Sequence, residues 1–252
     1  MHSLRLVGAQ APLVRAVLDA NPNTIVVYSS GKPVTEPWIS TSAAAVVQAF
    51  YGGEQHGNAL ADVLFGAYNP SGKLSVSIPH DVGTTPSYYD FLKGGRYIDA
   101  GHEYENGTLV FGHQYVLSSP KPLYPFGFGR SYSKFEFGTV ELDRVNATAT
   151  DTVTVRVPIR NAGKRDGTEV VQVYVTDKVA SVVVPNMELK GFKKVALKAG
   201  EKKVVKVDID VAGLGVWDMK RQYVVEKGEF IVKIAGGGGA DGIVGNASFW
   251  VN

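Results

Sequence analysis

The sequence predicts an α/β layered region followed by an all-β sandwich, with the change of character near residue 138. Before this point, continuous apolar runs alternate with helical spacing, the order expected of layered strands and helices. After it, apolar and polar residues alternate in short stretches separated by turns, which is typical of half-buried strands. The charge also changes, because residues 1–138 carry nine Lys and Arg against ten Asp and Glu, and residues 139–252 carry seventeen against fourteen. We therefore expect two domains, 1–138 and 139–252.

Two helices are expected in the first domain. Residues 10–20 place their apolar side chains at helical spacing, and the turn residues 21–23 end that helix. Residues 58–65 show a second apolar face at the same spacing. Gly66 follows it directly and suits the left-handed position that closes many helices.

Three strands are expected in the first domain. Residues 25–28 and 43–50 are almost wholly apolar, a pattern that indicates parallel strands covered on both faces. Residues 74–78 alternate between apolar and polar and predict a half-buried strand after the turn at 69–72. Residues 79–125 show no regular period, and we expect an irregular cover there.

The second domain is expected to be built from strands alone. About seven short strands in about 110 residues match the count and size of an immunoglobulin-like sandwich. The predicted strands are 153–159, 170–175, 189–195, 202–209, 223–225, 230–234 and 248–251.

Composition excludes several classes of function. The chain has 252 residues and a net charge of +2, so no strong field favours nucleic acid or an anionic membrane as a partner. It contains no cysteine, which excludes disulfides, thiolate metal sites and cysteine nucleophiles. No uncharged apolar run approaches the roughly 18 residues of a membrane span, and the first residues lack the layout of a signal peptide.

Several short motifs fail their structural tests. Residues 237–242 match G-x-G-x-x-G by letter, but they lie between two predicted strands and open no helix, so a flexible hairpin loop is the better interpretation. Residues 29–33 resemble the end of a phosphate loop without its glycine and hydroxyl residues. No G-x-S-x-G elbow is present. The histidines, which are His2, His56, His80, His102 and His113, show no metal-ligand spacing. We expect no cofactor and no metal.

One polar cluster stands at the predicted start of the second helix, in residues 53–60. Glu54 and His56 are candidates for contacting a ligand at a helix N-terminus. The alternative is helix initiation, in which the Glu54 carboxylate is favourably placed against the helix dipole. We keep both interpretations and favour the second.

Aromatic residues crowd the region that lacks a period. Their rings could stack on the apolar faces of sugars, or they could hold a long loop in place. We favour the structural role for residues 124–132 and leave both roles open for residues 88–97, where Tyr89 is the candidate for substrate binding. The aromatic residues are Tyr88, Tyr89, Tyr97, Tyr124, Phe126, Phe128 and Tyr132.

Three sequons for N-glycosylation begin at Asn106, Asn146 and Asn246. One or two sequons arise by chance in a chain of this length. They give mild support to a secreted eukaryotic origin and carry no weight in a bacterial protein.

Taken in order, a series of segments resembles the C-terminal part of glycoside hydrolase family 3 enzymes, the β-glucosidase and β-xylosidase group. The resemblance covers nearly the whole chain. Its segments are 21–27, 31–34 with Trp38, 49–54, 57–66, 69–74, 78–79, 123–129 and 131–132, followed by 161–163, 167–174, 188–192 and 200–201.

The resemblance implies a domain layout. The family has a (β/α)₈ barrel, then an α/β sandwich domain, then a fibronectin type III-like domain. Residues 1–138 would be the C-terminal portion of the α/β sandwich domain, with a long irregular loop segment. Residues 139–252 would be the fibronectin type III-like domain.

The resemblance also implies where catalysis resides. Retaining glycosidases use two carboxyl groups about 5 Å apart. In the family the nucleophile is an Asp on the barrel, and the acid/base Glu lies shortly before a segment whose end matches Leu4, Leu6, Gly8 and Gln10. Both carboxyl groups would therefore precede residue 1, and we expect no catalytic residue in this chain. None of the present candidates, Glu36, Glu54, Glu103 and Glu105, sits in the family's catalytic motif.

The expected function is that of a truncated β-glucosidase-type protein, inactive as this chain alone. The alternatives are a non-catalytic module that binds carbohydrate or protein, and a β-xyloside or arabinoside as the substrate class. Expected partners are a β-linked oligosaccharide or glycoside, a second copy of the chain, or the missing N-terminal barrel. The parent family implies an extracellular or periplasmic location.

Overall fold

The chain divides into two units, each with its own apolar core. The computed structural model describes residues 3–93, 102–103, 109–110, 119 and 121–252. The first unit comprises Met1–Tyr68, Ser77–Ser87 and Ile98–Tyr124, and the second comprises Asn69–Val76, Tyr88–Tyr97 and Pro125–Asn252. The domain boundary expected at residue 138 stays a prediction.

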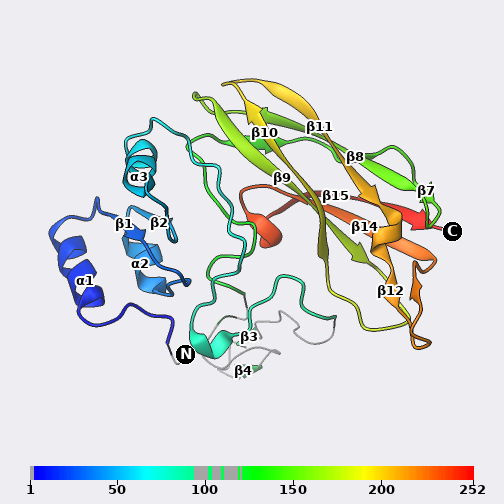
Figure 1. Ribbon diagram of the computed structural model, residues 1–252, viewed down its shortest axis with the longest axis horizontal. Helices are drawn as coiled ribbons and strands as arrows, with labels where there is room; N and C mark the ends of the chain where they lie inside the picture. Colours follow the sequence, from blue (N-terminus) through cyan, green and yellow to red (C-terminus); the bar gives the residue numbers. More distant parts are fainter. Residues whose placement is uncertain (1–2, 94–101, 104–108, 111–118, 120) are drawn as a thin grey trace. The chain divides into compact units, whose positions relative to one another are not determined.

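Two parallel strands form the centre of the first unit (Figure 1). Strand β1 pairs with β2 so that Ile25 lies opposite Ala45 and Tyr28 opposite Gln48. The elements of this unit are α1 (Gln10–Ala20), β1 (Ile25–Tyr28), α2 (Pro37–Ser42), β2 (Ala45–Gln48), α3 (His56–Leu64), the 3-10 turn η1 (Val82–Thr84), β3 (His102–Glu103) and β4 (Leu109–Val110).

The helices predicted at 10–20 and 58–65 are confirmed as α1 and α3. Gly66 has a φ of +81° and donates its N–H to the carbonyl of Val63 at 3.1 Å, so it closes α3 as expected. Helix α2 was not predicted, because its six residues are too few to show a period. Pro37 opens it at a position where a missing N–H costs nothing.

The strands predicted at 25–28 and 43–50 are present, the second only as residues 45–48. The expectation that both faces of these strands are covered is wrong for β1. Val26 and Tyr28 are buried, whereas Ile25, the first residue of the strand, is 46% exposed. The first unit has one small core cluster, which packs Val26 and Tyr28 with Val34 and Ile39 on a single face.

The strand predicted at 74–78 does not form. Leu74 exchanges backbone hydrogen bonds with Gly127 and Phe128, and Ile78 exchanges them with Tyr124. These pairings are too sparse to make a regular ladder. The exposure pattern differs from the alternation as well, because Val76 is 42% exposed and the Lys73 side chain is buried.

Two sheets form the second unit, as the sandwich prediction requires. One sheet has five strands in the order β10-β9-β14-β15-β7, and the other has the order β11-β8-β5 with β6 also paired to β8. Their strands are β5 (Phe135–Phe137), β6 (Glu141–Leu142), β7 (Asn146–Ala147), β8 (Thr152–Asn161), β9 (Gly167–Asp177), β10 (Glu188–Leu197), β11 (Lys202–Asp210), β14 (Gly228–Ala235) and β15 (Ile243–Val251), with a separate hairpin β12 (Val216–Trp217) and β13 (Tyr223–Val224) and the short turns η2 (Val211–Leu214) and η3 (Gly239–Asp241).

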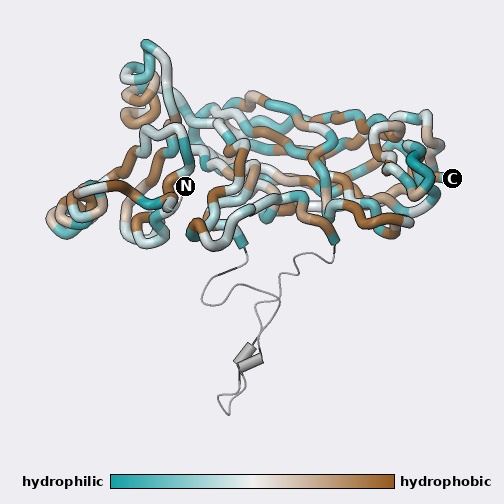
Figure 2. The backbone as a smooth tube through the Cα atoms, turned by 60° about the horizontal axis from the view of Figure 1, so that its bottom comes forward, coloured by the Kyte–Doolittle hydropathy of each residue, from teal (hydrophilic) through white to brown (hydrophobic). Residues whose placement is uncertain are grey.

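The sandwich core follows directly from the alternation in the sequence. Along β8 every second residue is buried, from Val153 to Ile159, and β11 shows the same period. Figure 2 shows this alternation of hydrophobic and hydrophilic positions along the strands. Phe230 and Phe249 stack with their ring centroids 5.7 Å apart across the pair β14–β15. The seven strands predicted in this domain are all confirmed.

The loop at 237–242 differs from the flexible hairpin that was expected. It does connect two antiparallel strands, but it forms the turn η3, and Ala240 is buried and donates its N–H to the carbonyl of Phe126 at 2.9 Å. Gly239 has a φ of +66°, and a Cβ there would lie 2.5 Å from the backbone nitrogen of Phe128. The glycines allow close packing of two backbones, not mobility.

Residues 69–76 belong to the second unit and are held there by side-chain bonds. Asn69 donates to the carbonyl of Asp166 at 2.8 Å and accepts from the Ser131 hydroxyl at 2.8 Å. Lys73 forms a buried ion pair with Glu169, at 2.7 Å between Nζ and Oε1. These contacts fasten the segment to the end of the sandwich.

Candidate functional site

The loops that follow β1 and β2 lie at one edge of the parallel sheet, since parallel strands end on the same side. Open α/β sheets bind ligands at this carboxyl edge. We define the carboxyl edge as residues 29–34 and 48–56. The Ser29 hydroxyl donates to the carbonyl of Phe50 at 3.4 Å and links the two loops. This edge is the candidate site of the first unit.

The loop after β2 presents an aromatic side chain to solvent. Phe50 has a φ of +52°, a conformation that non-glycine residues rarely adopt, and the next residue, Tyr51, is 80% exposed. A Cβ at Gly31 would lie 2.5 Å from a ring carbon of Tyr51. Glycine at this position therefore lets the Tyr51 ring rest on the loop that follows β1.

A second glycine makes room for a histidine. A Cβ at Gly52 would overlap the imidazole of His56, which is the first residue of α3. The His56 side chain is half-buried, whereas Glu54 on the intervening turn is exposed. The structure thus places the candidates Glu54 and His56 at the start of α3, as expected, and on the loop that follows β2.

Tyr89, the third candidate, lies elsewhere, in the second unit. Its ring stacks on Phe126 at 4.3 Å and meets the edge of Tyr174 at 5.7 Å between centroids. Its hydroxyl accepts the N–H of Leu189 at 3.3 Å, and burial raises its pKa. These contacts favour the structural role for Tyr89.

Sequence reasoning missed a polar group at the carboxyl edge. Gln48 ends β2, and both polar atoms of its side-chain amide are buried without a hydrogen-bond partner among the described residues. An unpaired buried amide costs free energy, so such a group indicates a missing ligand, water or protein contact. A glutamine at the end of an apolar strand was the available signal.

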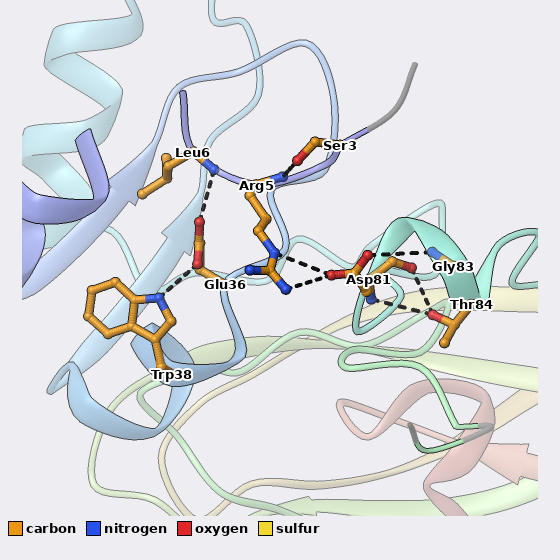
Figure 3. A network of polar contacts seen from close by, with 8 residues as sticks. All are labelled: Ser3, Arg5, Leu6, Glu36, Trp38, Asp81, Gly83 and Thr84. Atoms are coloured by element: carbon orange, nitrogen blue, oxygen red, sulfur yellow. Dashed lines mark hydrogen bonds and ion pairs between the residues drawn. The ribbon is translucent and has the colours of Figure 1, made fainter. Parts of the chain in front are cut away.

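Glu36 precedes α2 and is 5% exposed, and its carboxylate is fully engaged (Figure 3). One oxygen accepts the backbone N–H of Leu6 at 3.0 Å, and the other accepts the indole N–H of Trp38 at 2.7 Å. The Arg15 guanidinium lies 4.5 Å from the Trp38 ring and joins α1 to the same cluster. Glu36 thus ties the first described residues of the chain to the start of α2.

An ion pair adjoins this network (Figure 3). The Arg5 guanidinium donates to the Asp81 carboxylate at 2.8 Å and 3.2 Å. This hydrogen bonding lowers the pKa of Asp81 and raises that of Arg5. The carboxylate of Asp81 also accepts the N–H of Gly83 at the start of η1. Asp81 therefore has a structural task.

Of the remaining candidates, some are exposed and others lie outside the described residues. Asn146 on β7 and Asn246 on β15 are exposed, and both stay glycosylation predictions. Asn106 and Glu105 lie outside the described residues, and the side chain of Glu103 does too. Within the described ranges no group of three His, Asp or Glu side chains is arranged to hold a metal ion. No helix in the same ranges is long and apolar enough to cross a membrane.

Two protein-family models match the chain. The model of the glycosyl hydrolase family 3 C-terminal domain matches residues 1–132, and that of a fibronectin type III-like domain matches residues 169–237. Among curated relatives, thermostable β-glucosidase B of Acetivibrio thermocellus is 40% identical over 89% of this chain and 29% of its own length. A β-xylosidase of Formosa agariphila is 38% identical over 94% of this chain and 31% of its own. A periplasmic β-glucosidase of Salmonella typhimurium is 38% identical over 90% of this chain and 29% of its own length.

Solved structures show the same likeness to β-glucosidases. A β-glucosidase from Listeria innocua in complex with gluconolactone superposes with a TM-score of 0.89 at 32% identity, covering 99% of this chain and 34% of that one. A β-glucosidase from Erythrobacter marinus superposes with a TM-score of 0.87 at 34% identity, covering 99% of this chain and 31% of that one. A mutant of the Listeria innocua enzyme has been solved with laminaribiose. The chain thus spans about a third of the length of the proteins that it matches.

Proposed function

The chain belongs to glycosyl hydrolase family 3, and from this premise we propose that it serves as the C-terminal part of a β-glucosidase-type hydrolase. Its match to the family's C-terminal domain and to a fibronectin type III-like domain supports this role. The proposed reaction is hydrolysis of terminal β-D-glucosyl residues with retention of configuration. The names of the β-glucosidases above, at 38% to 40% identity, favour this substrate class.

The catalytic pair is proposed to come from outside this chain. Retaining hydrolysis needs a carboxylate nucleophile and a carboxylic acid about 5 Å apart on either side of the scissile bond. In the first unit, Glu36 and Asp81 are already held in hydrogen bonds that the fold requires. Glu54 is exposed to solvent on a turn, whereas a general acid usually lies in a buried site.

The carboxyl edge is the part of this chain proposed to meet the sugar. The observation that carries this is the exposed ring of Tyr51 held over Gly31, on the same edge as the unpartnered amide of Gln48. An aromatic face suits the apolar face of a pyranose, and an amide can bond its hydroxyls. Glu54 and His56 flank this position and are proposed to contact the ligand.

A chimera tests this proposal. In it, this chain replaces the matching part of the Acetivibrio thermocellus β-glucosidase, and hydrolysis of an aryl β-glucoside is measured. We expect turnover with retention of configuration. The Tyr51→Ala and Glu54→Gln chimeras should show a higher KM, whereas Tyr68→Ala, an exposed tyrosine outside the edge, should not. An unchanged thermal transition shows that a chimera is folded. A folded chimera that does not hydrolyse the aryl β-glucoside would overturn the proposal.

A second candidate function is a non-catalytic module that docks to another protein part. The observation in its favour is the apolar exposure in the first unit, where Leu13 is 64% and Phe65 90% exposed. Docking to a catalytic barrel would cover such residues.

The alternative substrate class, a β-xyloside, is supported by the β-xylosidase that is 38% identical to this chain. The periplasmic relative supports a location outside the cytoplasm.

A further inference from the structure

A cavity of about 300 Å³ opens on the second unit. It lies between the segment that leads from β9 to β10 and the segment that leads from η2 into β12, the orange hairpin in Figure 1. Valine, proline and leucine account for seven of its eleven lining residues, and Asp177, Glu188, Gly215 and Trp217 are the others. Its volume is at the lower end of the range of small-ligand pockets.

Trp217 is the unusual member of this lining. Its indole is 68% exposed, although large aromatic side chains are normally highly buried. The edge-on contact with Tyr223, at 5.6 Å between centroids, fixes the ring, and Tyr223 in turn packs on Gly215, where a Cβ would lie 2.7 Å from it. The hairpin therefore presents a held aromatic surface next to a cavity, which core packing does not require.

Two carboxylates provide acceptors at the same cavity. Asp177 uses one oxygen to accept the N–H of Val179 at 3.1 Å, and burial raises its pKa. Glu188 lies 3.2 Å from the Nζ of Lys190. Both therefore keep acceptor capacity for a donor-rich ligand.

Charge compensation distinguishes between a neutral and a cationic ligand. Lys190 neutralises Glu188, and Lys93, which bonds the backbone carbonyls of Asp177 and Lys178, partly offsets Asp177. The nearby Glu226 accepts hydrogen bonds from Ser181. With the two lining carboxylates so offset, the cavity favours a ligand with many hydroxyls and one apolar face over an ammonium group.

We propose that this cavity, with Trp217 as its aromatic wall, is a second saccharide-binding site in the fibronectin type III-like domain. The choice of a β-linked glucosyl saccharide as the ligand rests on the proposed function. The site would hold a sugar next to the hydrolase without taking part in the chemistry. Indole stacking and hydroxyl donation to Asp177 and Glu188 supply the contacts.

Titration of the purified chain with laminaribiose tests the proposal, with intrinsic fluorescence of its three tryptophans as the readout. We expect a saturable change that Trp217→Ala abolishes, with an affinity loss of about tenfold or more by equilibrium dialysis. Trp250→Ala is the matched control, because Trp250 is 51% exposed on β15 and does not line the cavity. It should bind like the unchanged chain.

Three outcomes would overturn the proposal: no saturable change, an equal loss in both tryptophan variants, or saturable binding of tetramethylammonium in place of laminaribiose. Thermal unfolding of each variant establishes that it is folded. The test is independent of catalysis, because binding is measured on the chain itself. An inactive chimera together with intact laminaribiose binding by the chain would mean failure of the proposed function alone, so that failure and failure of this site are distinguishable.

Discussion

At the scale of single residues, buried polar groups hold the two units in shape. The Lys73 ammonium contacts the Glu169 carboxylate at 2.7 Å and the carbonyl of Gly129 at 2.8 Å, with both side chains less than a tenth exposed. Removing one charge from such a pair leaves the other buried and uncompensated. The pair therefore matters more to stability than any of the exposed ion pairs.

Glu169→Gln should lower the free energy of unfolding by about 3–5 kcal/mol, measured by urea denaturation. Glu136→Gln is the control. Glu136 pairs with exposed Lys134 and Arg160, at 3.9 Å and 3.8 Å, and its loss should cost less than about 1 kcal/mol. Equal losses in the two variants would show that the buried pair has no special role.

The Arg5–Asp81 pair should stabilise the fold in a pH-dependent way. Arg5 lowers the pKa of Asp81 in the folded chain, so the contribution is present above the ordinary Asp pKa near 4 and is lost as the pH falls through the lowered value. Both side chains are exposed, which limits it to about 0.2–1 kcal/mol. Arg5→Ala should therefore be less stable than the unchanged chain at pH 7 and equal to it near pH 2. A difference that persists at pH 2 would contradict this account.

At the scale of elements, the sandwich was predictable because the sequence of each strand by itself shows which side chains face the core. The alternation along β8 and β11 marks which side chains face the core, and the structure buries them. The strand expected at 74–78 failed because alternation cannot reveal whether a partner strand exists. The candidate edge was found in part: Glu54 and His56 stand in a recognisable helix start. The exposure of Tyr51 and the orphaned amide of Gln48 arise only when the two loops meet.

Strand β5 provides a test of how the sandwich is delimited. Phe135 and Phe137 on β5 pack against the sandwich core, yet both precede the predicted boundary at 138. We expect residues 139–252 to fold alone and unfold cooperatively, but with a lower midpoint in urea than residues 125–252. Circular dichroism of the two fragments during urea unfolding measures both properties. No cooperative transition in the shorter one would move the boundary toward residue 125.

At the scale of the whole molecule, the first unit leaves apolar side chains uncovered. Leu13 and Val17 on α1, Ile25 on β1 and Phe65 after α3 are 43% to 90% exposed. Exposed apolar side chains and unpaired sheet edges promote association. This unit is therefore expected to bind another surface, either a second copy or the rest of a hydrolase.

Analytical ultracentrifugation at micromolar concentration should detect self-association of the purified chain. The double variant Leu13→Lys and Phe65→Lys should shift it toward monomer. Met219→Lys, at an 89% exposed position in the second unit, should not. A strictly monomeric chain that binds no hydrophobic dye would show that the first unit closes its own core.

The central claim is that this chain contributes structure and sugar contacts to a family 3 hydrolase, while the catalytic carboxylates come from elsewhere. The most direct measurement is the rate at which the purified chain hydrolyses aryl β-glucosides and aryl β-xylosides. The account predicts no turnover above buffer, because Glu36 and Asp81 are engaged in the fold and Glu54 lies on an exposed turn. Turnover well above buffer that Glu54→Gln abolishes would contradict it.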